Sequence, residues 1–285
     1  MPFLSCFFTA IGPGAQPIKG GYHNNPAFFG HPEKIFDSLN VVACVDLSLE
    51  PNDRNCLHPT PSLAEGFEDI AIDHEGRRVF CIIESMEDTD GKYRGFLSEY
   101  DQDFRFQRCA RLSTTFETPN TGFEGLAYLR RGGNEYIFAM CEGNLCTAAT
   151  SGGGRIQVFK GTEEGNWAWS HQLEIPLSAE FEDYAGISYR DGRLAVVSQA
   201  SARVWVAEID RDARLLVDGT QGVYRFPKKS YGNVEGIAWL SANTLVCVSD
   251  KKKKRQPEKC AEKDQSIHIF RIPESSLVGG GPAGG

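Results

Sequence analysis

The chain has 285 residues, of which 41% are hydrophobic and 11% aromatic, with 30 glycines and 14 prolines. This composition is typical of a folded domain rich in tight turns and excludes a disordered chain. The net charge of −8 disfavours nucleic acid as a default partner, because phosphate binding depends on clustered Lys and Arg. No stretch approaches the roughly 20 apolar residues that span a bilayer, so we expect no membrane partner.

The first segment, residues 1–39, has no regular pattern, and we expect an irregular segment or a partial repeat unit there. Residues 1–10 are apolar but contain no basic residue, which makes them a poor signal peptide. The sequence therefore predicts a cytoplasmic protein, or a secreted one if the start is misassigned. Residues 40–49, NVVACVDLSL, have the character of a strand.

A short phrase is then repeated four times. Its copies are GFEDIA at 66–71, GFEGLA at 122–127, DYAGIS at 183–188 and NVEGIA at 233–238. When Ala185 of the third copy is registered with Glu68, Glu124 and Glu235, the spacings are 56, 61 and 50 residues. Repeats of this period indicate propellers, solenoids or arrays.

Each copy opens a series of short alternating segments separated by turn residues, which is the pattern of antiparallel strands. Four such strands make one propeller blade. We predict an all-β β-propeller over residues 40–273 with five blades, four and six being the alternatives. The fourth unit lacks an outer strand, so we expect residues 40–49 to complete it, closing the ring with N- and C-terminal strands. The Gly-rich tail, residues 274–285, should be disordered.

Blade geometry places the start of the first strand and the end of the second strand on one side. The phrase then brings Glu68, Glu124, Asp183 and Glu235 to one channel mouth, and the second strands bring Glu84, Glu142, Gln199 and Asp250. Crowded carboxylates repel unless a proton or a cation neutralises them. Oxygen ligands select a hard cation, and calcium tolerates irregular geometry. We therefore predict calcium as the cofactor.

The predicted metal ligands are the four acidic residues of the phrase, Glu68, Glu124, Asp183 and Glu235. An alternative stays open, in which these side chains accept hydrogen bonds from backbone amides of neighbouring blades and act as structural fasteners.

A basic run follows Asp250, in the loop between the second and third strands of the fourth unit. It consists of Lys251, Lys252, Lys253, Lys254 and Arg255. Three interpretations stay open: a solvated loop, a nuclear-localisation patch, or a surface that binds an anionic ligand such as a phosphate ester.

The nine cysteines form no CxxC pair, which disfavours a zinc site. Cys81, Cys141 and Cys247 lie in apolar strand runs, where buried free thiols are the ordinary interpretation. A bridge between Cys141 and Cys146 is the alternative for a secreted protein.

The repeated phrase resembles the calcium-binding propeller group that includes the SdiA-regulated family and the phytase-like, esterase-like propellers. More distantly, it is similar to the strictosidine synthase, paraoxonase and gluconolactonase propellers. The chain also looks like proteins of an uncharacterised family through CEGN at 141–144, FEDYAG at 181–186, AVVSQ at 195–199 and DQSIHIFRIP at 264–273. The resemblance implies that Glu68, Glu124 and Glu235 hold calcium. The third copy departs from the pattern, because Ala185 stands at the aligned position.

Two functions stay open. The first is a metal-dependent hydrolase acting on a phosphoester, ester or lactone, with Glu84, Glu142 or Asp250 as the general base. The second is a non-catalytic propeller, expected to be monomeric, that binds a protein or a small anionic ligand, since the fold alone cannot decide between the two.

Overall fold

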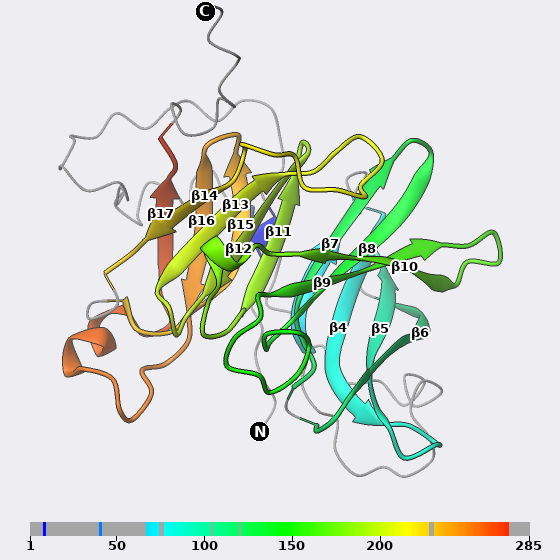
Figure 1. Ribbon diagram of the computed structural model, residues 1–285, viewed down its shortest axis with the longest axis horizontal. Helices are drawn as coiled ribbons and strands as arrows, with labels where there is room; N and C mark the ends of the chain where they lie inside the picture. Colours follow the sequence, from blue (N-terminus) through cyan, green and yellow to red (C-terminus); the bar gives the residue numbers. More distant parts are fainter. Residues whose placement is uncertain are drawn as a thin grey trace, which may run out of the picture. The chain divides into compact units, whose positions relative to one another are not determined.

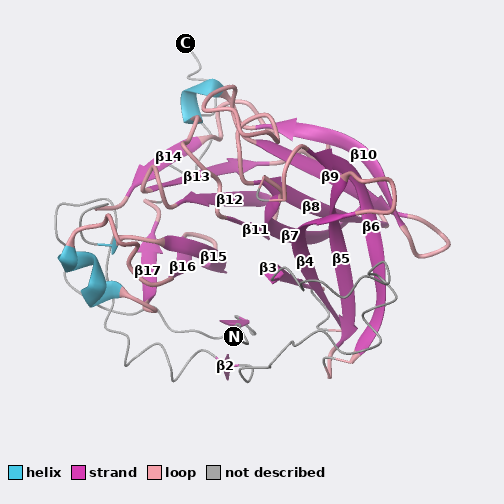
Figure 2. Ribbon diagram, turned by 90° about the horizontal axis from the view of Figure 1, so that it is seen from below, coloured by secondary structure: helices cyan, strands magenta, loops and turns pink. Residues whose placement is uncertain are grey.

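The computed structural model describes residues 67–73, 77–103, 105–119, 121–227 and 231–273, and the backbone of two short strands at residues 8–9 and 40–41. The described part of the chain is dominated by strands, accompanied by the short 3₁₀ helices η3 (Leu177–Ala179) and η4 (Glu258–Lys263) (Figure 2). The chain divides into two compact units. Unit 1 comprises Met1–Ser5, Val45–Gly186 and Arg211–Leu215, and unit 2 comprises the remaining residues.

Unit 1 contains two four-stranded antiparallel sheets, in which strands adjacent in the sequence pair with one another (Figure 1). The first sheet consists of β3 (Phe67–Ile72), β4 (Arg78–Glu87), β5 (Tyr93–Asp101) and β6 (Phe106–Phe116). The second consists of β7 (Phe123–Arg131), β8 (Asn134–Cys141), β9 (Arg155–Gly161) and β10 (Trp167–Glu174). Each repeated phrase therefore starts a meander, because short turns favour antiparallel pairing of consecutive strands.

The core of unit 1 is aromatic and belongs to both sheets. Phe123 of β7 makes edge-to-face contacts with Phe116 of β6, at 4.9 Å between ring centroids, and with Phe159 of β9, at 6.3 Å. Phe80 of β4 stacks on Tyr128 of β7 at 5.0 Å. Burial of each such side chain contributes on the order of 2 kcal/mol, so these contacts hold the two sheets together.

Unit 2 contains the other sheets. The first has four strands, namely β11 (Gly186–Arg190), β12 (Arg193–Ser198), β13 (Arg203–Glu208) and β14 (Gly222–Arg225). The next has three, namely β15 (Val234–Ser241), β16 (Thr244–Ser249) and β17 (Ile267–Arg271). A two-stranded sheet joins β1 (Phe8–Thr9) to β2 (Asn40–Val41).

The predicted fold class, an all-β propeller of antiparallel blades, is confirmed, but the preferred number of five blades is wrong and the alternative of four is the one observed. The described residues form four blade sheets instead of five. Dividing the chain length by the repeat spacing counted the residues before Phe67 as another blade, whereas the pairing described there is that of β1 with β2. Residues 42–49 and the tail, 274–285, lie outside the described residues.

The expected closure of the fourth blade by residues 40–49 is wrong at its first two residues. Asn40 and Val41 pair with Thr9 and Phe8, and the sheet that contains β17 has three strands among the described residues.

The cysteines correct one further expectation. Cys247 is a buried free thiol as predicted and Cys81 is buried and outside any disulfide, whereas Cys141 is joined to Cys146 in a disulfide with a Cα–Cα distance of 5.1 Å. Cys109 is also disulfide-bonded. The bridge at Cys141 closes the turn that directly follows β8.

Candidate metal site in unit 1

The glutamate of the repeated phrase occupies a β-bulge. In β7, Phe123 pairs with Cys141 and Gly125 pairs with Met140, which are consecutive residues of β8. Glu124 is therefore the extra residue of a β-bulge. Glu68 in β3 and Glu235 in β15 are extra residues in the same way. A bulge turns a side chain out of the normal strand alternation. The phrase therefore repeats because it builds the same local distortion in three strands.

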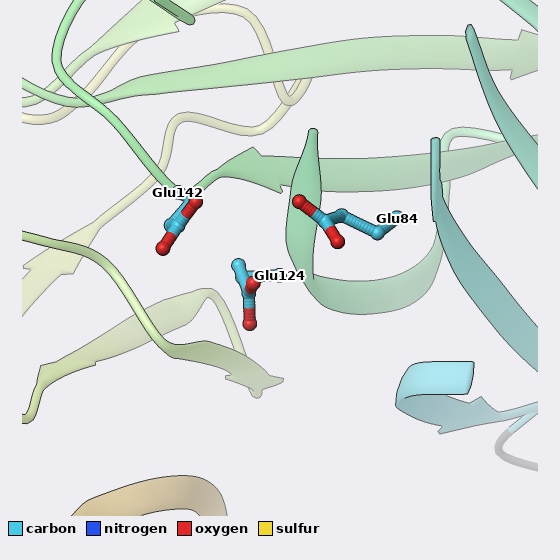
Figure 3. A group of neighbouring side chains, drawn as sticks. All are labelled: Glu84, Glu124 and Glu142. Atoms are coloured by element: carbon cyan, nitrogen blue, oxygen red, sulfur yellow. The ribbon is translucent and has the colours of Figure 1, made fainter. Parts of the chain in front are cut away.

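Three carboxylates gather in unit 1, and we call them the acidic trio. Glu84 lies in β4, Glu124 lies in β7, and Glu142 directly follows the last residue of β8. One carboxylate oxygen from each lies within 4.8 Å of the others, and all three residues are half-buried. Figure 3 shows the three carboxylates facing a shared space from different elements.

Gly122 fixes two members of the trio. Its amide donates a hydrogen bond to Glu84 Oε1 at 3.3 Å, and its carbonyl accepts one from the amide of Glu142 at 3.0 Å. A Cβ atom at this position would lie 2.2 Å from the carbonyl oxygen of Glu84. The close approach requires glycine, and it places Glu84 and Glu142 beside the strand that carries Glu124.

The turn after Glu142 is held by buried polar contacts. Asn144 is fully buried, donates to the carbonyl of Phe181 at 3.1 Å and accepts from the hydroxyl of Tyr184 at 3.1 Å. The amide of Tyr184 donates to the carbonyl of Glu142 at 2.9 Å. Burial raises the pKa of Tyr184, so its hydroxyl remains a donor. These contacts, together with the disulfide, fix the backbone on which Glu142 stands.

The electrostatics of the trio favour a cation or a proton. Two unit charges 4.8 Å apart repel by roughly 1 kcal/mol in water and by about 3 kcal/mol at an effective dielectric constant near 20. Calcium binds oxygen ligands at about 2.3–2.6 Å, so two oxygens on opposite sides of one ion lie about 5 Å apart. The donor type and the spacing of the trio therefore fit a calcium ion.

The predicted metal ligands have different surroundings. Glu124 belongs to the trio, and Glu68 is exposed on β3. Asp183 is half-buried and immediately precedes Tyr184. Glu235 of unit 2 lies 3.9 Å from Lys253 Nζ.

The predicted general bases also lie in different parts of the structure. Glu84 and Glu142 are the other two members of the trio, whereas Asp250 is exposed in unit 2. The trio thus combines one residue predicted as a ligand with two predicted as bases. Alignment of the second-strand ends was the signal that located those two.

Side chains that fasten one blade to the next also occur at residues outside the predicted set. Asp69, one residue after Glu68, accepts hydrogen bonds from the amides of Ile70 at 2.8 Å and Leu126 at 2.7 Å. In unit 2, Ser188 Oγ accepts from the amide of Trp239 at 3.2 Å. The aspartate at a position that the other copies fill with glycine was the available signal.

Unit 2 contains a buried polar pair that the sequence pattern did not reveal. Ser249 Oγ is hydrogen-bonded to His268 Nε2, and the two residues are only 5% and 4% exposed. The histidine ring packs against Tyr231 at 4.8 Å and Phe270 at 6.2 Å. The pair is enclosed in an aromatic core, so it serves packing and not chemistry on an external substrate.

A small apolar pocket also lies in unit 2. Its volume is about 20 Å³, which is room for about one water molecule. Its lining includes Tyr224, Phe226 and Phe270. This pocket is too small to hold a substrate.

No helix within the described residues is both long and apolar enough to cross a membrane.

Comparison with known proteins gives distant structural likenesses only. No family model and no curated protein matches the chain. The structure is similar to a chain of a nidogen/laminin complex (TM-score 0.36, 14% identity, 63% of this chain and 54% of that chain). It is also similar to a sucrose-6-phosphate hydrolase from Lactobacillus gasseri (0.43, 10%, 72% and 45%) and a periplasmic gluconolactonase from Pseudomonas aeruginosa (0.40, 14%, 76% and 58%). The chain spans about half the length of these proteins, and none of the likenesses bears on its function.

Proposed function

We propose that unit 1 binds a calcium ion through Glu84, Glu124 and Glu142, and that the chain is a calcium-binding protein of the propeller class. The observation that carries the proposal is the convergence of three carboxylates within 4.8 Å from three separate elements. Such a cluster is the donor set of a hard divalent cation.

Calcium is favoured over magnesium by the irregularity of the cluster. Magnesium requires nearly octahedral geometry and holds its own waters, whereas calcium accepts six to eight oxygens in a flexible arrangement. Three half-buried carboxylates leave coordination positions for water or for a ligand oxygen. The bulge at Glu124 supplies a carboxylate that regular strand alternation would not place there.

A metal-dependent hydrolase is the second candidate, because a cation with open positions could act on a phosphoester, ester or lactone. Bound calcium would polarise the carbonyl or phosphoryl oxygen of such a substrate. In this case two of Glu84, Glu124 and Glu142 would hold and orient the ion, and the third would accept a proton from the attacking water. The non-catalytic alternative has the same site without turnover.

The test is a calorimetric titration of chelator-treated protein with calcium, on wild type, Glu124→Gln and the matched control Glu68→Gln. Both variants lose one carboxylate from the same bulge position, but Glu68 lies outside the trio. We expect binding by wild type and Glu68→Gln, and at least a tenfold weaker affinity in Glu124→Gln. An absence of binding heat in wild type would contradict the proposal.

The hydrolase candidate is tested with a panel of phosphatase, esterase and lactonase substrates, with and without calcium. Turnover that needs calcium and is lost in Glu124→Gln supports it. Calcium binding without turnover on any class leaves the non-catalytic function.

A further inference from the structure

The basic run of unit 2 lies on a loop whose backbone is fixed. We call residues 250–264, which connect β16 to η4 and its end, the basic loop. Asn233 is 1% exposed, donates to the carbonyl of Lys251 at 2.9 Å and accepts from Gln256 Nε2 at 2.8 Å. Gln256 Oε1 in turn accepts from the amide of Lys253 at 2.8 Å. A network of hydrogen bonds that starts at the buried Asn233 therefore determines the course of the loop.

The acidic neighbours of the loop neutralise only part of its charge. Lys252 Nζ lies 3.0 Å from Glu258, and Lys253 Nζ lies 3.9 Å from Glu235. Within the described part of the chain, Lys251, Lys254 and Arg255 are exposed and take part in no ion pair. The loop carries seven basic and four acidic residues, a net charge of +3 in a chain of net charge −8. The loop is therefore locally positive, although the chain as a whole is negative.

This arrangement suits an extended polyanion better than a single small anion. Exposed basic side chains bind a polyanion through several weak contacts, and their affinity depends on the release of counterions. The fixed backbone lowers the entropy that would be lost on binding. A partner with anionic groups spaced along a chain could contact several of these side chains together.

The disulfides narrow the class of polyanion. Cys141 is bonded to Cys146, and Cys109 is also disulfide-bonded. Disulfides persist in oxidising compartments, chiefly outside the cytosol. There, sulfated polysaccharides are a common partner of Lys- and Arg-rich segments. We infer that the basic loop is a docking surface for a sulfated polysaccharide, bound through Lys251, Lys254 and Arg255.

The test uses the full chain and a fluorescent heparin decasaccharide as the probe, with affinity measured across a series of salt concentrations. The triple variant Lys251→Ser, Lys254→Ser, Arg255→Ser removes the unpaired charges and leaves Asn233 and Gln256 in place. Its matched control, Lys92→Ser, Arg105→Ser, Lys160→Ser, removes three exposed charges from unit 1. Thermal melting of both variants checks that each is folded.

We expect the loop variant to bind at least tenfold more weakly, with a shallower dependence of affinity on salt, and the control to match wild type. Equal loss in both variants, or no binding by wild type, would overturn the inference. So would displacement by millimolar inorganic sulfate, which would indicate a single-anion site. Tighter binding to duplex DNA than to the decasaccharide would also overturn the inference and would indicate a surface that binds nucleic acid.

Discussion

Two copies of one phrase show how neighbours decide the role of a residue. Glu124 in unit 1 and Glu235 in unit 2 are both the extra residue of a bulge in the first strand of a blade. Glu124 lies within 4.8 Å of two further carboxylates, whereas Glu235 lies 3.9 Å from the ammonium group of Lys253. The same backbone feature therefore places a carboxylate in the acidic trio in unit 1 and beside a lysine in unit 2.

The largest expected effect is that of Gly122→Ala, which disturbs the strands that carry the acidic trio in unit 1. The new Cβ would lie 2.2 Å from the carbonyl oxygen of Glu84, so the strands must separate, at about 3 kcal/mol or more of unfolding free energy. Gly132→Ala is the control, because a Cβ at Gly132 meets nothing within 4 Å and only its φ of +55° opposes the change. It should cost about 1 kcal/mol. Urea denaturation measures both, and equal losses would contradict the role of Gly122.

Removal of the disulfide should have the next largest effect. Cys141→Ser with Cys146→Ser opens the loop that begins at Glu142, and the chain-entropy model gives a loss of about 2 kcal/mol for so short a loop. Because Glu142 would be less well fixed, calcium affinity should also fall severalfold. Cys81→Ser, which changes a buried cysteine outside the disulfides, is the control for cysteine replacement. Calcium affinity unchanged by the double substitution would show that Asn144 alone positions Glu142.

The acid stability of unit 1 gives a separate effect of about the same size. Burial alone would raise the pKa of Glu135, but hydrogen bonds from Arg78, Arg130 and Tyr128 outweigh it and lower the pKa to about 2. Since the folded pKa lies below the unfolded value, the stabilisation is fully present above about pH 4.5 and is lost as the pH falls toward 2.

We expect wild type to lose about 2 kcal/mol across that interval through this group. Glu135→Gln should be less stable at pH 7 and should show a flatter profile. Denaturant titrations at several pH values test this, with the exposed Glu163→Gln as the control. A profile as steep as that of wild type would assign the acid sensitivity to other carboxylates.

The smallest effect is expected from Lys253→Glu, which makes the surroundings of Glu235 resemble those of Glu124. The ion pair that is lost is partly exposed, so the stability change should stay below about 1 kcal/mol. Two carboxylates should create at most weak, millimolar calcium binding in unit 2. Calorimetry on the background of Glu124→Gln isolates this site. Tight binding there would mean that two carboxylates suffice and that the trio is not special.

Much of the fold, and part of the site, could be predicted from the sequence. The phrase and its alternating segments identify the first strand of each of the four described blade sheets, because local patterns dictate local strands. The prediction of a fifth blade was wrong because the length of the chain does not show which strands pair. The convergence of Glu84 and Glu142 followed from strand ends, but the bulge at Glu124 depends on a register that only the partner strand defines. The fastening role of Asp69 and the bridge at Cys141 likewise depend on neighbours in space.

The most direct test of the proposed metal site is calcium titration of wild type, Glu124→Gln and Glu235→Gln side by side. Both substitutions remove a carboxylate from the same position of the same bulge. Calcium affinity should fall at least tenfold in Glu124→Gln and stay at the wild-type value in Glu235→Gln. Equal affinities in all three proteins, or no binding in any of them, would contradict the proposal that the acidic trio binds the ion.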